Sequence, residues 1–172
     1  MAVTIDEFNG MDAAAARALV SVWAAVPVWA DALVAARPYS SADALAEAAG
    51  ALAAGWSRDD LDAALAHHPR IGARVTGENA EATASRSEQA AMRDAAADVT
   101  AKIAAGNAAY EERFGRVFLI RAAGRSPEEM LVALERRLGN DDEVEAAEAT
   151  AQLAEIALLR LRTDVTDEGV PS

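Results

Sequence analysis

Two histidines stand side by side at positions 67 and 68, and the sequence has no others. An imidazole titrates near neutral pH, so a histidine can accept or deliver a proton under physiological conditions. Pro69 ends the helical pattern before it, because proline lacks an amide hydrogen and restricts the residue that precedes it. The pair is therefore expected at the end of a helix, where a ring can project into a cleft.

A second polar cluster, Ser85 to Gln89, opens the next helical pattern. Ser85 and Glu88 have the spacing of a capping box, and the positive end of a helix favours the anionic form of Glu88. Gln89 offers both hydrogen-bond donors and acceptors, which suits a ureide or an amide. We expect the two helix ends to face each other and to form one site in which His68 moves a proton.

Each of these residues also has a purely structural interpretation. A histidine pair at a helix end can interact with the helix dipole, and Ser85 with Glu88 can simply cap a helix. In this interpretation, Gln89 and the arginines at 37, 70, 121 and 160 would be ordinary residues of a solvated surface. The catalytic interpretation requires the whole set to come together.

The composition limits the class of protein. Its 172 residues suit one domain, and a hydrophobic content of 52% that is rich in alanine favours packed helices. The formal net charge of −12 argues against binding to nucleic acid or to an anionic membrane surface. The chain has no cysteine, no basic leader pattern and no apolar stretch long enough to span a bilayer, so we expect a cytoplasmic protein.

The periodicity predicts an all-α, single-domain, compact multi-helix bundle over residues 1–163, with a flexible tail over 164–172. One apolar run without helical character, near residues 116–122, is expected to be an extended connection with free backbone N–H groups. Residues 71–84 are expected to form a loop around the site. The helices are expected near residues 12–23, 29–34, 41–54, 57–68, 85–105, 107–114, 126–138 and 140–161.

Several common catalytic patterns do not occur in this sequence. Adjacent histidines without neighbouring carboxylates or cysteines are weak evidence for zinc, and we predict no metal site. There is neither a glycine-rich phosphate loop nor a Gly-x-Ser-x-Gly nucleophile elbow.

An ordered set of short motifs runs from residue 5 to about residue 162 and resembles one family, the 2-oxo-4-hydroxy-4-carboxy-5-ureidoimidazoline (OHCU) decarboxylases. These enzymes catalyse the third step of urate degradation. The motifs are Phe8-Asn9, Trp29, Arg37-Pro38-Tyr39, His68-Pro69-Arg70-Ile71-Gly72, Ser85-x-x-Glu88-Gln89, Asn107 to Tyr110, Arg113-Phe114-Gly115, Phe118-Leu119-Ile120, Arg136-Arg137-Leu138-Gly139-Asn140 and Arg160-Leu161. Many family members have His-Pro-Asp-Leu where this chain has His68 to Ile71, which leaves a site role for Arg70 open.

The resemblance implies an all-helical carboxy-lyase that needs no cofactor and releases (S)-allantoin. It assigns the proton to His68, with Glu88 as the second catalytic residue, and it places Pro69 in the substrate site. Ser85 and Gln89 would hold the ureido group and the ring amides. Backbone groups of Ile120, Arg121 and Ala122 would hold the ring carbonyl side, and Arg160 is the candidate for the substrate carboxylate.

Two other functions remain open from the sequence. One is a metal-dependent amidohydrolase that acts on a ureide, and the other is a non-catalytic helical interaction module. The expected partner is a small-molecule substrate, with no nucleic acid and no membrane. Members of the family often form dimers, so the resemblance also implies a homodimer.

Overall fold

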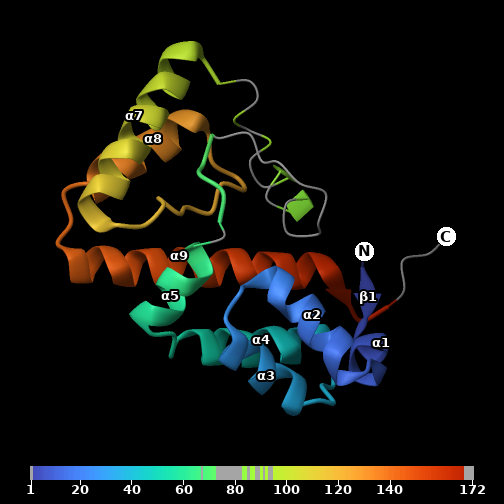
Figure 1. Ribbon diagram of the computed structural model, residues 1–172. Coiled ribbons are helices and arrows are strands. Elements are labelled where there is room, and N and C mark those ends of the chain that lie inside the picture. Colours follow the sequence, from blue (N-terminus) through green and yellow to red (C-terminus); the bar gives the residue numbers. More distant parts are fainter. Residues whose placement is uncertain are drawn as a thin grey trace. The chain divides into compact units, whose positions relative to one another are not determined.

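Helices make up most of the described chain, and the all-α prediction is confirmed (Figure 1). The computed structural model describes residues 2–66, 68–72, 83–84, 86–87, 90, 92 and 95–168. The elements are β1 (Val3–Thr4), α1 (Ile5–Gly10), α2 (Ala13–Trp23), α3 (Pro27–Ala35), α4 (Ala42–Ala53), α5 (Arg58–Leu65), α7 (Ala97–Phe114), α8 (Pro127–Arg137), α9 (Asp142–Asp164) and β2 (Val165–Thr166).

The chain forms two compact units. The first unit comprises Met1–Ser57 with Ala154–Ser172, and the second comprises Arg58–Leu153. Helix α9 contributes its last part to the first unit and its beginning to the second. The expectation of a single domain over residues 1–163 stays a prediction.

In the first unit, the two ends of the chain pair with each other. Strands β1 and β2 run parallel, with Val3 opposite Val165 (Figure 1). The Asp167 carboxylate accepts a hydrogen bond of 2.6 Å from the amide of Ala42 at the start of α4. The prediction of a flexible tail over residues 164–172 is therefore wrong for Val165 and Thr166, which pair with β1. Hydrophobic periodicity does not reveal a strand of only two residues.

The motif residues near the N-terminus hold the first unit together. Asn9 and Tyr39 exchange two hydrogen bonds, from the Asn9 side chain to the Tyr39 carbonyl at 2.8 Å and from the Tyr39 amide back at 2.9 Å. Arg37 Nη1 donates to the carbonyls of Phe8 and Met11, at 2.8 Å each, and so binds the end of α1. These motif residues therefore have structural roles.

In the second unit, α7 is one continuous helix. The prediction of a break at Gly106-Asn107 is wrong, since both residues lie inside α7. A Cβ atom at Gly106 would lie 2.5 Å from Leu134 Cδ2 of α8, so this glycine allows the two helices to approach closely. Glycine inside a helix costs about 1 kcal/mol relative to alanine, and packing against α8 offsets that cost. The helix expected over residues 85–105 is not continuous, because Ala95 and Ala96 are not helical and α7 begins at Ala97.

The connection between α7 and α8 has no regular secondary structure over residues 117–122, as predicted. The predicted helix start at Ser126 is confirmed: Ser126 and Glu129 form a complete capping box and Pro127 is the first helical residue. The predicted cap at Asn140 is wrong. Its side-chain amide donates instead to Glu145 at 2.9 Å, inside the second unit.

The inward face of α9 carries polar residues that an apolar pattern overlooks. The apolar pattern of residues 140–161 predicts that Val144 and Ala147 point inward, but both are exposed. Glu145 is fully buried in their place, and Gln152 is nearly so. The pattern was read from apolar residues alone, and a buried acid with strong partners breaks that rule.

Glu145 and Arg137 form a buried ion pair in the second unit. The side chains are 0% and 1% exposed, and Arg137 contacts Glu145 Oε1 from Nη2 at 2.5 Å and from Nε at 2.9 Å. The same oxygen accepts from the Tyr110 hydroxyl, and Asn140 donates to the other oxygen. Burial, and then the hydrogen bond to Glu145, raise the pKa of Tyr110, so its hydroxyl stays protonated and donates. Arg137 Nη1 donates to the Leu119 carbonyl at 2.7 Å, which ties the network to the connection.

Within the described ranges, no helix has both the length and the apolar character that crossing a bilayer requires.

Replacing Arg137 by methionine should lower the free energy of unfolding by about 3–5 kcal/mol, because the Glu145 carboxylate would stay buried without its cation. Arg136→Met is the matched control, since the neighbouring Arg136 forms an ion pair with Glu148 while its own side chain is 57% exposed. That exposed pair should contribute no more than about 1 kcal/mol. Urea denaturation measures both values, and equal losses in the two variants would contradict a special role for the buried pair.

Candidate active site

The segment His68–Gly72 leaves the end of α5 as predicted. The His68 amide donates to the Leu65 carbonyl at 3.0 Å, which closes the last turn, and Pro69 follows immediately. His68 and Pro69 are both partly exposed. Gly72 has a φ of 77°, and a Cβ atom there would lie 3.3 Å from Met92 Cε. Glycine is thus required where the segment turns away from the helix.

Two side chains of α7 hold this segment. Glu111 accepts from Arg70 Nε at 2.5 Å and from Arg70 Nη2 at 2.7 Å, a two-pronged ion pair. One turn earlier, the buried Asn107 donates from Nδ2 to the Ile71 carbonyl at 2.9 Å. The backbone that carries His68 is therefore fixed on α7 at two consecutive residues, and Arg70 has a positioning role.

The apolar core of the second unit joins this segment to the connection. Ile71, Ile120 and Ala122 all belong to one buried cluster, together with residues of α7 and α8. The cluster is built mainly on α7, whose inward positions include Ile103 and Tyr110. The two parts of the chain that the sequence assigns to the site thus share a common support.

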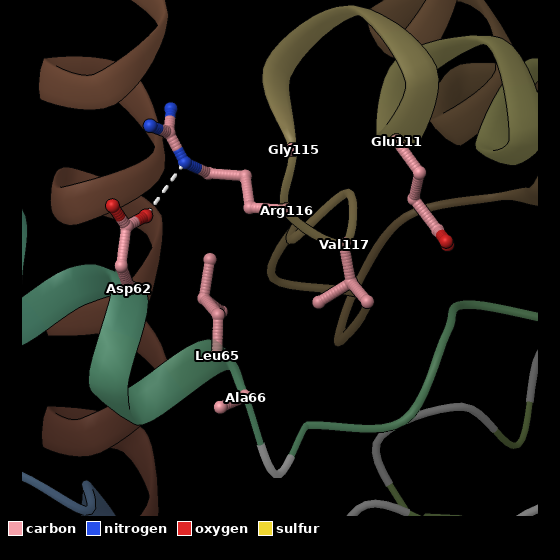
Figure 2. Close-up of a pocket in the computed structure, with 7 residues that line it drawn as sticks. All are labelled: Asp62, Leu65, Ala66, Glu111, Gly115, Arg116 and Val117. Carbon is pink, nitrogen blue, oxygen red and sulfur yellow. Dashed lines mark hydrogen bonds and ion pairs between the residues drawn. The ribbon is translucent and has the colours of Figure 1, made fainter.

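One cavity borders this segment, and a second lies at the end of α5. One, of about 250 Å³, lies between Arg70–Gly72 and the side of α7 that includes Asn107. The other, of about 330 Å³, lies between the end of α5 and the start of the connection at Gly115–Val117 (Figure 2). Glu111 lines both cavities. Each has room for a ring of five atoms.

Arg116 forms one wall of the larger cavity. Its side chain is only 3% exposed, and its Nε donates to Asp62 of α5 at 2.8 Å. Figure 2 shows the guanidinium reaching Asp62, while the Glu111 carboxylate points away from this pair. The ion pair therefore fixes the start of the connection against α5.

Of the three backbone N–H groups predicted to bind substrate, at Ile120, Arg121 and Ala122, two are available. The Arg121 N–H already donates to Gln152 Oε1 of α9 at 2.9 Å. The N–H groups of Ile120 and Ala122 have no hydrogen-bond partner among the described residues. Ile120 and Ala122 therefore remain the candidates for backbone recognition, and a role for the Arg121 side chain stays a prediction.

Arg160 lies in the first unit, where it is 4% exposed and its Nη1 donates to the Val22 carbonyl at 2.8 Å. This contact ties α9 to the end of α2. The proposed contact of Arg160 with the substrate carboxylate stays a prediction.

The predicted residues Ser85, Glu88 and Gln89 lie outside the described residues, as does most of the predicted loop over residues 71–84. Among the residues that are described, no three imidazole or carboxylate side chains gather in the way that a metal ion would need.

The fold and these motifs can now be compared with known proteins. The model of the OHCU decarboxylase family matches residues 9–162. The chain belongs to this family. An OHCU decarboxylase from Amia calva is 31% identical over 138 residues, which cover 79% of each chain. An OHCU decarboxylase from Haloferax volcanii is 29% identical over 133 residues, or 77% of each chain.

Solved structures agree with the OHCU decarboxylase assignment. A crystal structure of OHCU decarboxylase in the presence of (S)-allantoin superposes with a TM-score of 0.71 at 25% identity, covering 83% of this chain and 94% of that one. A crystal structure of (S)-allantoin synthase also gives a TM-score of 0.71, at 20% identity, covering 95% of this chain and 54% of that one. The second likeness concerns the fold alone.

Sequence reasoning assigned no role to Asn107, Glu111 or Gln152. Asn107 could have been found, because it continues the apolar stripe Ile103, Tyr110 and Phe114 once α7 is treated as one helix. A buried asparagine needs hydrogen-bond partners, so its place on that stripe is a signal. The other two residues carry no such signal, since each depends on a partner distant in the sequence.

Glu111→Gln should weaken the pH dependence of stability in the acid range. The hydrogen bond from Arg70 is the main cause that holds the pKa of the Glu111 carboxyl below its usual range. A lowered pKa stabilises the fold above the pKa of the unfolded chain, and this stabilisation is lost as the pH falls through the lower folded value. The stability difference between wild type and variant should therefore shrink between about pH 5 and pH 3.

Urea denaturation across this pH series measures the difference. Glu112→Gln removes one charge from the same turn of α7 and is the control for net charge. A difference for Glu111→Gln that stays constant down to pH 3 would show that the ion pair with Arg70 does not form in solution.

Proposed function

We propose that this protein is an OHCU decarboxylase that converts OHCU to (S)-allantoin in urate degradation. The observation that carries the proposal is the family match over residues 9–162, nearly the whole chain. The positioned segment around His68 supports it, because it gives a proton-transfer group a fixed place. The expectations of a cytoplasmic location and a homodimer stay predictions.

The reaction can proceed without an external electron sink. The name of the substrate places its carboxylate and a hydroxyl on one ring carbon, beside the carbon that bears the ureido group. When the bond to the carboxylate breaks and CO₂ leaves, the electron pair passes into the carbon–nitrogen double bond of the ring, and that nitrogen takes a proton. The product is an enol of allantoin. Its hydroxyl then loses a proton to become the ring carbonyl, while another proton is added to the ureido-bearing carbon.

Delivery of that proton from one side gives a single enantiomer, and His68 is the proposed donor. An imidazole can exchange a proton at neutral pH, and the reaction needs its ring at a constant angle to the substrate. The hydrogen bond from Asn107 to the Ile71 carbonyl and the ion pair of Glu111 with Arg70 hold the backbone next to His68 in place. Pro69 would form part of the wall beside the ring.

The remaining roles concern recognition. Glu88 would act beside His68, and Ser85 and Gln89 would bind the ureido group and the ring amides. The N–H groups of Ile120 and Ala122 would donate to carbonyl oxygens of the ring and so hold it in one orientation. Arg160 would bind the carboxylate that is lost.

Replacing His68 by asparagine should abolish stereoselective decarboxylation and leave the helical circular dichroism spectrum unchanged. OHCU is generated from urate in situ, and the appearance of (S)-allantoin is followed by optical activity. The proton donor is then missing while the fold remains, so the rate should fall by about 100-fold or more.

His67→Asn is the matched control, because the family pattern places the catalytic histidine directly before proline. This variant should retain its rate, and a metal chelator should have no effect on the wild type. Full turnover by His68→Asn would contradict the proton role, and inhibition by the chelator would favour a metal-dependent amidohydrolase.

Glu88→Gln separates a helix cap from a catalytic group. We expect the rate to fall by roughly 10- to 1,000-fold while the melting temperature changes little, because glutamine can still serve in a capping box. Thermal melts and initial rates on the same preparation measure both quantities. A lower melting temperature with an unchanged rate would assign Glu88 to capping alone.

A further inference from the structure

The connection between α7 and α8 has one set of backbone groups that is bonded to protein and another that is not. The carbonyls of Leu119 and Arg121 accept hydrogen bonds from arginine side chains. The Arg121 N–H donates to the Gln152 side chain. Among the described residues, the Ile120 N–H, the Ile120 carbonyl and the Ala122 N–H have no hydrogen-bond partner. Ile120 is only 6% exposed, and buried backbone groups without partners are rare in folded proteins. These groups are therefore suited to a ligand.

Three side chains set the directions of these free groups. A trans peptide carries its C=O and N–H on opposite sides, so fixing one fixes the other. Arg137 holds the Leu119 carbonyl at 2.7 Å and thereby turns the Ile120 N–H away from itself. Arg125 Nε holds the Arg121 carbonyl at 3.1 Å and does the same for the Ala122 N–H.

Gln152 controls the peptide between these two. Its Oε1 accepts from the Arg121 N–H at 2.9 Å, so the Ile120 carbonyl points away from α9. Gln152 lies seven residues after Glu145, on the same face of α9, and Glu145 is the partner of Arg137. One face of α9 thus holds the connection directly at Arg121 and, through Arg137, at Leu119.

The unbonded groups match the chemistry of a cyclic ureide. Such a ring presents C=O and N–H groups side by side, so one ring amide can accept from the Ile120 N–H and donate to the Ile120 carbonyl. The Ala122 N–H adds a second donor for another ring carbonyl. The N–H and the C=O of Ile120 can face the ring together only if a side chain fixes the peptide between Ile120 and Arg121.

We propose that Gln152 is a positioning residue that holds the Ile120–Arg121 peptide so that Ile120 N–H and C=O bind the ring amide of the substrate. This inference rests on the proposed function. Gln152 does not touch the reacting atoms in this proposal and acts only through the backbone. Because the ring amide is present in substrate, transition state and product alike, the loss should appear mainly in binding.

Gln152→Met, which keeps the length of the side chain and removes the acceptor, tests the proposal. We expect KM for OHCU to rise about 10- to 100-fold with kcat within about threefold of wild type, since a small displacement of a binding group costs this much. The dissociation constant for (S)-allantoin, measured by calorimetry, should rise by a similar factor. The calorimetric measurement needs no turnover, so it stands even if the wild type fails to decarboxylate OHCU and the proposed function is wrong.

Two further variants complete the test. Thr150→Val on the same helix loses only a hydrogen bond to Ala146 of its own helix and should leave KM and binding unchanged. Gln152→Glu keeps an oxygen acceptor and should retain KM within about fivefold of wild type, which a residue needed only for packing would not explain. Wild-type binding and KM in Gln152→Met would overturn the proposal. If Gln152→Met does not fold, a folded Gln152→Glu variant with a KM raised 10-fold or more would overturn it instead.

Discussion

The buried ion pair of Arg137 and Glu145 is the interaction on which the second unit depends. Taking both charges out of water is costly, and the pair is tolerable only because every strong donor around it has an acceptor. Tyr110 and Asn140 complete the coordination of the carboxylate, and Arg137 stacks over the Phe118 ring at 4.6 Å. The network joins α7, α8 and α9 to the connection. An apolar core could bring the three helices together, but it could not fix the direction of a backbone carbonyl.

The same principle operates at the other part of the candidate site. The segment after α5 has no regular structure, so its conformation must come from contacts with its neighbours. Arg70 supplies a surface ion pair to Glu111, and Asn107 supplies a buried hydrogen bond to Ile71. The buried bond sets the position of the chain, because it is shielded from water and salt. The ion pair lies at the surface, and we expect its contribution to be smaller and sensitive to pH.

The sequence predicted the helices well and their partners poorly. Capping residues such as Ser126 and Ser41, and the stop at Pro69, are local signals, and the structure has helix ends at these places. The errors at Gly106 and Val144 have one cause, since both came from interpreting a helix without knowing what packs against it. For the site, the motif order was sufficient to identify the family, and the role of His68 stays a prediction. The supporting residues Asn107, Glu111 and Gln152 depend on pairings between distant parts of the chain, which one sequence does not reveal.

These supports explain how a small helical protein can recognise a ring with its backbone. Side chains that bind a substrate lose rotamer freedom when it arrives, whereas peptide groups fixed in advance lose little. Leu119 and Arg121 are already held in place when the chain folds, by hydrogen bonds with Arg137, Arg125 and Gln152. A backbone donor beside a backbone acceptor also discriminates by geometry, because a ring that lacks either group leaves a buried polar atom without a partner. In the proposed binding mode, α9 thereby contributes to selectivity for a cyclic ureide without touching the ring.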